Sequence, residues 1–214
     1  MNRCAAIIVA AVAFVATPGA GQITRPFDVA QGRPFDVAQG RPFDAAQGRP
    51  RLPDVKFVPT PQSAVDAMLE LARVTSADVV YDLGCGDGRI PITAAKKYGA
   101  RGVGIEIDMF YLRDAIDNKT KAGVGDRVTF VNQDLFEADI SPATVVTLFL
   151  LPRLNQQLIP KLKRELRPGT RIVSHQFDMG EQWPPEQTKD VNGLTIYLWT
   201  IRCVSGVARP ALRS

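Results

Sequence analysis

In Val79-Val80-Tyr81-Asp82-Leu83-Gly84-Cys85-Gly86-Asp87-Gly88-Arg89-Ile90, a short apolar run is followed at once by three glycines spaced two apart. The run Val79–Leu83 is nearly continuous, which is typical of a central parallel strand buried on both faces. A glycine-rich turn between strand and helix is where open α/β folds hold a cofactor. The spacing excludes two kinds of site. A dinucleotide fold needs glycine where Arg89 stands, and the Gly-Lys-Ser/Thr of a nucleotide triphosphate loop does not occur.

Helix and strand patterns alternate on the C-terminal side of this stretch. Helices are predicted over 89–98, 108–122 and 155–166, and further strands over 102–107, 127–131, 143–151 and 171–176. Pro160 is expected either to kink the last of these helices or to start it anew. Asn192-Gly193 stands between the runs 188–191 and 194–202, which is a strong hairpin signal. The predicted fold class is therefore α/β, a Rossmann-like doubly wound sheet of about seven strands with a C-terminal antiparallel hairpin.

An acidic residue stands at the end of each of three successive predicted strands: Asp82, Glu106 and Asp134. The carboxyl ends of parallel strands meet at one rim of the sheet, where ligands bind. S-adenosyl-L-methionine carries an ammonium group, a sulfonium and an adenosine but no phosphate. Asp82 suits the ammonium group, Glu106 the two ribose hydroxyls and Asp134 the adenine amino group. Each acid alone is more typical of a solvated loop or a helix cap, but three on one rim favour this cofactor.

The surroundings of these acids are expected to complete the site. The glycines let the backbone approach the ligand closely, because they carry no Cβ. Ile107 or Leu135 is expected to flank the adenine ring. Thr60 is expected to act as an N-cap, with Pro61 in the first position of a helix. The three cysteines, Cys4, Cys85 and Cys203, give neither a disulfide framework nor a metal cluster, so no metal site is predicted.

From Thr60 to about Arg202 the chain resembles the class I, or seven-strand, S-adenosylmethionine-dependent methyltransferases. Residues 82–88, Asp-Leu-Gly-Cys-Gly-Asp-Gly, are a specific form of their first motif. More specifically, the chain is similar to the archaeal and mitochondrial protein-lysine methyltransferases. The shared stretches are 58–61, 81–90, 144–152, 163–166 and 171–175.

The resemblance implies that Thr60 contacts the cofactor and that Val58–Thr60 helps to cover its methyl group. Phe57 departs from the family, whose members often have Tyr there. The full set of predicted cofactor-binding residues is Thr60, Asp82, Gly84, Cys85, Gly86, Gly88, Glu106, Ile107, Asp134 and Leu135.

The predicted function is methyl transfer from S-adenosyl-L-methionine to lysine side chains of a protein substrate. Two alternatives stay open: a small-molecule methyltransferase with the same cofactor site, and an exported, non-catalytic binding module. Burial beside a sulfonium lowers the pKa of an acceptor amine. No dedicated base is therefore required, and no catalytic residue is identified.

A nucleic-acid substrate is not expected from the sequence. The run 143–152 contains neither Asn/Asp-Pro-Pro-Tyr/Phe nor a cysteine nucleophile. Residues 1–51 hold six Arg and three Asp and so carry most of the net charge of +4. Residues 52–214 hold 20 basic and 19 acidic residues, which gives no net charge for binding phosphates.

The chain divides into three predicted segments. Residues 1–21 are interpreted as a signal peptide or short membrane-targeting leader, because Arg3 precedes an apolar run and small residues. Residues 22–51 are interpreted as a disordered linker with three eight-residue repeats, and 52–214 as the methyltransferase domain. Membrane contact is expected only through an uncleaved leader. The leader indicates export or membrane attachment, whereas cofactor supply indicates the cytoplasm, so the compartment stays open, as does the oligomeric state.

His175, the sole histidine, ends a predicted strand. It is interpreted as a hydrogen-bonded structural residue, with a role near the substrate as the alternative. Trp183 and Trp199 are expected to be packing residues rather than a cation-binding cage.

Overall fold

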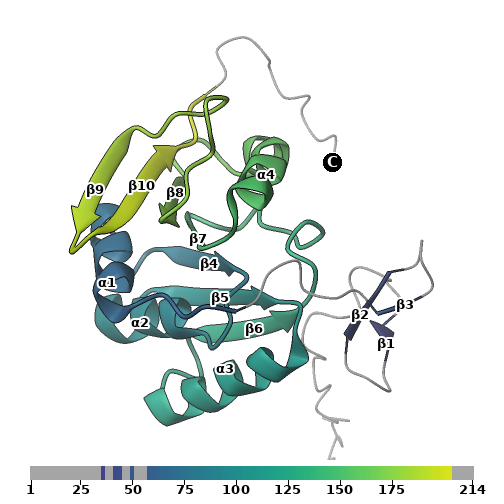
Figure 1. Ribbon diagram of the computed structural model, residues 1–214. Helices are drawn as coiled ribbons and strands as arrows, with labels where there is room; N and C mark the ends of the chain where they lie inside the picture. The colour runs from purple at the N-terminus through teal and green to yellow at the C-terminus, as the bar shows by residue number, and fades with distance from the viewer. Residues whose placement is uncertain (1–34, 37–40, 45–48, 51–56, 204–214) are drawn as a thin grey trace, which may run out of the picture. The chain divides into compact units, whose positions relative to one another are not determined.

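The computed structural model of the protein describes residues 35–36, 41–44, 49–50 and 57–203. Residues 57–203 contain a seven-stranded sheet flanked by helices (Figure 1). Its strands are β4 (Val79–Leu83), β5 (Arg101–Glu106), β6 (Val128–Asn132), β7 (Val145–Leu148), β8 (Arg171–His175), β9 (Gln187–Val191) and β10 (Leu194–Thr200). The helices are α1 (Gln62–Leu71), α2 (Arg89–Tyr98), α3 (Met109–Ala122) and α4 (Pro152–Glu165). Among the described residues, none of the helices is long and apolar enough to cross a bilayer. The predicted leader lies outside the described residues.

The strand order is β6-β5-β4-β7-β8-β10-β9. Strands β4 to β8 are parallel, whereas β10 runs antiparallel to both β8 and β9. Asn192 and Gly193 join β9 to β10 with φ values of 56° and 79°. Two positive φ values are what a type I′ hairpin turn requires. The predicted doubly wound sheet of seven strands with a C-terminal hairpin is therefore confirmed.

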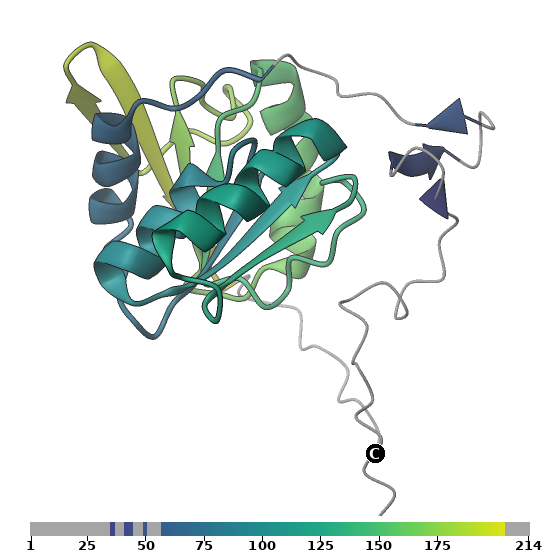
Figure 2. The same ribbon diagram turned by 90° about the horizontal axis from the view of Figure 1, so that it is seen from below.

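Alternating side chains of the buried strands serve two separate core layers. Val80 and Val145 belong to a cluster with the apolar residues of α1 and α2. Tyr81 and Val146 belong to the other cluster, which includes the buried face of α4. Helix α3 packs against β6 and α2 (Figure 2). The two layers cover the faces of the sheet. The loops that follow the strands form its carboxyl-end rim.

Two predicted element boundaries are corrected by the structure. Thr60 is not the N-cap of α1, because Pro61 occupies that position and no side chain caps the helix. The apolar run after residue 143 forms a strand only over 145–148. Pro152 ends the run because it stands in the first turn of α4, where a missing N–H costs nothing. Helix α4 then continues through Pro160 and does not restart there.

Three short strands lie within the predicted linker: β1 (Phe35–Asp36), β2 (Arg41–Asp44) and β3 (Arg49–Pro50). They pair antiparallel, with Asp36 opposite Arg41 and Asp44 opposite Arg49. Each pair joins the Asp at the fourth position of a repeat to the Arg five residues further along the chain, so the two pairs are related by the eight-residue period. The sequence predicts no strands here, since each repeat contains Pro and Gly. The other linker residues lie outside the described part of the chain, and the segment boundaries stay a prediction.

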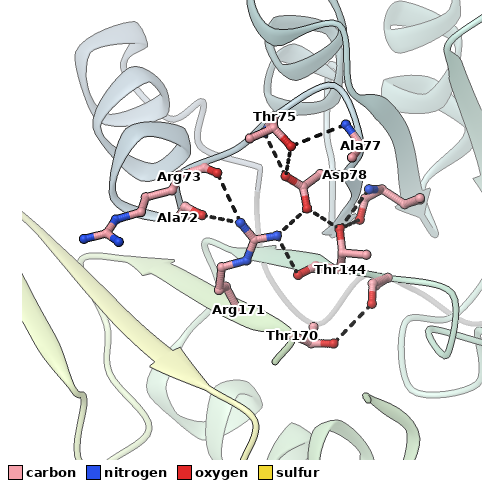
Figure 3. Close-up of polar contacts among 10 residues, drawn as sticks. Ala72, Arg73, Thr75, Ala77, Asp78, Thr144, Thr170 and Arg171 are labelled. Carbon is pink, nitrogen blue, oxygen red and sulfur yellow. Dashed lines mark hydrogen bonds and ion pairs between the residues drawn. The ribbon is translucent and has the colours of Figure 1, made fainter. Parts of the chain in front are cut away.

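A polar network ties β4, β7 and β8 together at their amino ends (Figure 3). The Arg171 guanidinium is bound to the Asp78 carboxylate and also donates to the carbonyl of Ala72 at 2.7 Å. Asp78 accepts further hydrogen bonds from the Thr144 hydroxyl at 2.7 Å and the Thr75 N–H at 2.8 Å. Burial by itself would raise the pKa of Asp78, but these donors and the Arg171 charge hold it below its ordinary value. Asp78 is therefore the ionised centre of the network.

We expect Arg171→Met to lower the free energy of unfolding by about 2–4 kcal/mol, because it leaves the buried Asp78 carboxylate without its cation. Urea denaturation of the full chain measures this. Arg164→Met is the matched control, since Arg164 pairs with Glu165 at 2.7 Å but its side chain is 66% exposed. The free energy of unfolding of Arg164→Met should fall by no more than about 0.5 kcal/mol. Equal losses in the two variants would contradict the assigned role of the network.

Candidate cofactor site

A cavity opens at the carboxyl ends of β4, β5, β6 and β7. The order of strands reverses between β4 and β7, and this is the point at which open α/β sheets bind ligands. Including its open mouth, the cavity measures about 900 Å³. Eight of the predicted cofactor residues line it: Thr60, Asp82, Gly84, Cys85, Glu106, Ile107, Asp134 and Leu135.

Gly86 and Gly88 stand just outside this lining. Both have the left-handed backbone that favours glycine, with φ values of 53° and 76°. A Cβ on Gly86 would collide with the ring of Phe57, and one on Gly88 would collide with the ring of Phe130. The sequence indicates close approach by the ligand at these glycines. In the structure, aromatic side chains of the protein itself make that approach.

Asp82 is the second-to-last residue of β4, lines the cavity and is 3% exposed. Its Oδ1 accepts a hydrogen bond from the Thr147 hydroxyl of the neighbouring strand β7 at 2.7 Å. Burial raises the pKa of Asp82 to about 7; the Thr147 hydrogen bond opposes this shift, and the charges of Glu106 and Asp87 add to it. A buried carboxylate with a raised pKa is electrostatically suited to a cationic ligand, which would stabilise its ionised form.

Glu106 ends β5 and joins two loops around the cavity. Its Oε2 accepts the N–H of Gly86 and its Oε1 accepts the N–H of Asp108, both at 2.8 Å. Burial raises the pKa of Glu106, although these backbone donors oppose the shift. Asn132 supports the same turn by donating to the carbonyls of Glu106 and Ile107 at 2.9 and 3.0 Å. Because each carboxylate oxygen has two acceptor sites, Glu106 can also accept ribose hydroxyls.

Asp134 follows β6 and is 4% exposed. Its Oδ1 accepts the N–H of Phe136 at 2.9 Å, so the side chain orders the turn in which it stands. Ile107 and Leu135 line the cavity together with Asp134. An apolar wall beside a carboxylate is the combination that an adenine ring with its amino group requires.

Residues before α1 are fastened to the glycine turn by Arg89. This side chain donates to the carbonyl of Thr60 at 2.8 Å and pairs with Asp87 at 2.6 Å. The ring of Phe57, in the same N-terminal segment, lies 4.5 Å from that of Tyr111 in α3. All five side chains line the cavity. Sequence reasoning identified Thr60 by resemblance. It assigned no role to Arg89, although this residue lies in the shared stretch 81–90, and it missed Tyr111, which belongs to no motif.

Cys85 is buried, and burial raises the pKa of its thiol well above the ordinary value, with the charges of Asp82 and Glu106 adding to the effect. The thiol is therefore a neutral part of the cavity wall rather than a nucleophile.

His175 is also buried, but in the described part of the chain neither of its ring nitrogens has a hydrogen-bond partner. The interpretation of a hydrogen-bonded structural histidine is therefore wrong. Trp199 is fully buried and donates to the carbonyl of Trp183 at 2.8 Å. The ring of Trp183 lies under the Lys163 ammonium, with 4.6 Å between the nitrogen and the ring centroid.

The cavity fits S-adenosyl-L-methionine by the chemistry of its lining. Asp82 offers a buried carboxylate for the ammonium group, and Glu106 offers carboxylate oxygens for the ribose hydroxyls. Asp134, Ile107 and Leu135 form the part suited to adenine. When bound, the cofactor supplies a methyl group already activated on a sulfonium. The protein has to hold it, orient the acceptor and exclude water.

Known proteins agree with this interpretation of the cavity. Residues 82–187 match the ANTKMT methyltransferase domain family. The chain is 50% identical over 154 residues to a protein-lysine N-methyltransferase of Saccharolobus islandicus, covering 70% of this chain and 96% of the relative. It is 33% identical over 132 residues to the adenine nucleotide translocase lysine N-methyltransferase of Mus musculus, and this match covers 61% of this chain and 56% of the relative.

A solved structure is similar over nearly the same region. It is described as an RNA methyltransferase from Salinibacter ruber in complex with S-adenosyl-L-homocysteine. The two chains are 56% identical with a TM-score of 0.67, and the match covers 73% of this chain and 100% of the other. The chain therefore belongs to the class I S-adenosylmethionine-dependent methyltransferases, in the protein-lysine N-methyltransferase family.

Proposed function

We propose that this enzyme transfers methyl groups to lysine side chains of proteins. The observation that carries the proposal is 50% identity along 96% of a protein-lysine N-methyltransferase. The acceptor end of the cavity supports it, because Phe149, Leu150 and Leu154 line that part of the wall. An apolar wall disfavours an ammonium ion, so it lowers the pKa of a lysine amine that enters. A neutral amine has the free electron pair that methyl transfer needs.

RNA is the second candidate acceptor, since the similar Salinibacter ruber protein is described as an RNA methyltransferase. The charges of the cavity argue against it. Five acidic residues line the cavity, whereas Arg89, the one basic residue among the described residues that line it, is already paired with Asp87. Phosphate groups bind where basic side chains gather.

The mouth of the cavity also favours a protein acceptor. Val58 lines the cavity and is 58% exposed. Phe110 and Leu151 are 67% and 45% exposed, and each is next in sequence to a cavity residue. The exposed apolar surface of Val58 in the cavity wall, and of these two neighbours in sequence, fits a polypeptide segment better than a polyanion.

The test is to incubate the full chain with methyl-tritiated S-adenosylmethionine and a cell lysate. The labelled products are then separated into precipitable material and the soluble pool, and the precipitable material is digested with ribonuclease or proteinase. We expect the label to remain in precipitable material after ribonuclease, to be lost after proteinase, and to appear as methyl-lysine after acid hydrolysis. Label that disappears with ribonuclease would favour RNA, and label confined to the soluble pool would favour a small molecule. Cofactor binding with no transfer to any fraction would favour a non-catalytic binding module.

A further inference from the structure

His175 occupies a position that packing alone does not explain. It is 2% exposed, and within the described residues both ring nitrogens lack a hydrogen-bond partner. The Oδ1 atom of Asn155, which is fully buried, lacks one as well. Polar atoms buried without partners cost stability, so each such group in a folded protein requires a reason. The predicted cofactor contacts do not use either residue.

The position of His175 in the sheet places it at the acceptor end of the cavity. The acids predicted to bind the adenosine part stand at the end of β5 and just after β6, and Asp82 stands near the end of β4. The part of the rim that carries none of these acids belongs to β7 and β8. Leu148 of β7 is paired with Ser174 of β8, which makes Phe149 and His175 the next neighbours along these strands. The centroids of the Phe149 and His175 rings lie 4.2 Å apart. Phe149 lines the cavity, whereas His175 does not, so the histidine is separated from the cavity by no more than a neighbouring ring.

The backbone around His175 is fixed by polar contacts. Asn155 donates to the carbonyl of Phe177 at 3.0 Å and to the Ser174 hydroxyl at 3.3 Å. Ser174 itself donates to the Phe177 carbonyl at 2.5 Å. Asn155 follows Leu154, which lines the cavity. The backbone that carries the histidine is therefore held in place, whereas the neighbouring Phe149 ring is only half-buried.

We propose that His175 hydrogen-bonds the acceptor amine at the Phe149 end of the cavity and so orients its electron pair. This inference rests on the proposed lysine acceptor. A neutral imidazole has one nitrogen that accepts an N–H and another that donates. Burial lowers the pKa of His175 below its ordinary value, which keeps the ring neutral at neutral pH. This contact requires the Phe149 ring to turn aside when the amine enters.

The first test compares two substitutions of the same residue. His175→Phe keeps a ring of similar size but removes both nitrogens. We expect it to lower kcat by about 100-fold, the scale of a lost orienting contact. The Kd for S-adenosylhomocysteine should stay unchanged and the Tm should not fall, because the substitution removes no hydrogen bond that the wild type makes. His175→Gln keeps an acceptor and a donor, and it should recover about tenfold of the loss. A His175→Phe variant with wild-type kcat overturns the proposal.

The second test uses the fact that His175 is the sole histidine of the chain. Protein labelled with ¹⁵N in histidine gives ring-nitrogen signals from this residue alone. The probes are a synthetic peptide spanning a lysine labelled in the lysate assay and the same peptide with norleucine, each added to enzyme saturated with S-adenosylhomocysteine. We expect only the lysine peptide to shift the ring nitrogens. Equal effects of the two peptides, or none, refute the contact with the amine.

The outcomes separate the inference from the function on which it rests. If the wild-type enzyme forms no methyl-lysine in any protein, the proposed function fails and the role of His175 fails with it. If methyl-lysine forms and His175→Phe is as active as the wild type, only the role of His175 is wrong.

Discussion

Glu106→Ala is expected to weaken the binding of S-adenosylhomocysteine by about 100-fold, equivalent to about 2.7 kcal/mol. The carboxylate has two functions that disappear together. It is the predicted acceptor for the ribose hydroxyls, and hydrogen bonds to a charged group contribute about 1.5–3 kcal/mol. It also holds the N–H groups of Gly86 and Asp108, each at 2.8 Å, and thereby sets the width of the cavity between two loops.

The expected cost to folding differs from the cost to binding. The alanine variant leaves two backbone donors without their carboxylate partner, so the Tm of the free protein should also fall. Glu106→Gln retains one acceptor oxygen, so its cofactor affinity and its Tm should fall less than those of Glu106→Ala. Isothermal titration calorimetry gives the affinity, and thermal unfolding without ligand gives the stability.

Asp190→Ala is the matched control for this experiment. Asp190 is likewise a carboxylate that accepts the N–H of a turn glycine, Gly193, at 3.1 Å, but it is exposed, near the end of β9. Its loss should leave cofactor affinity unchanged. An unchanged affinity in Glu106→Ala would remove Glu106 from the cofactor site, whatever its effect on the Tm.

The sheet was predictable because its signals are local. Each central strand is a short apolar run, and Asn192-Gly193 is a pair that readily adopts the two positive φ values of a tight hairpin turn. The acids at the strand ends were predictable for a related reason. Parallel strands bring their carboxyl ends to one rim, so Asp82, Glu106 and Asp134 had to meet once the strands were identified.

The rest of the cavity wall was not predictable, because it depends on tertiary packing. Tyr111 and Phe149 come from elements whose distance from the glycine turn no local pattern encodes. The contact of Phe57 with Gly86 depends on how residues before α1 cross the turn. Thr60 was predicted to be the N-cap of α1, but Pro61 occupies that position. The carbonyl of Thr60 accepts a hydrogen bond from Arg89. Local propensity yields to such long-range contacts.

The affinity for S-adenosylhomocysteine is expected to depend on pH through Asp82. Burial raises the pKa of this carboxyl to about 7 in the free protein, and an ammonium group beside it would favour the ionised form. Binding to the ionised form alone makes the apparent affinity fall by about tenfold per pH unit below 7. Above pH 7 the affinity should level off.

The stability of the free protein should show the opposite trend. The folded-state pKa lies above the ordinary value of 3.8, so the folded chain holds this proton more tightly than the unfolded chain. The contribution of Asp82 to stability is then fully present below pH 3.8 and is lost as the pH rises through about 7. A bound cation offsets that loss. The rise in Tm on adding S-adenosylhomocysteine should therefore be larger at pH 8 than at pH 6.

Asp82→Asn separates this carboxyl from other titrating groups. Asparagine has nearly the same shape, and its amide oxygen can still accept the Thr147 hydroxyl that lies 2.7 Å from Asp82 in the wild type. We expect the variant to bind S-adenosylhomocysteine about 30-fold more weakly at pH 8, on the scale of a lost charged hydrogen bond, and to lose the pH dependence between 6 and 8. Calorimetry at three pH values measures both effects. A variant that keeps the wild-type slope would assign the pH dependence to another group and leave Asp82 with a structural role in the rim.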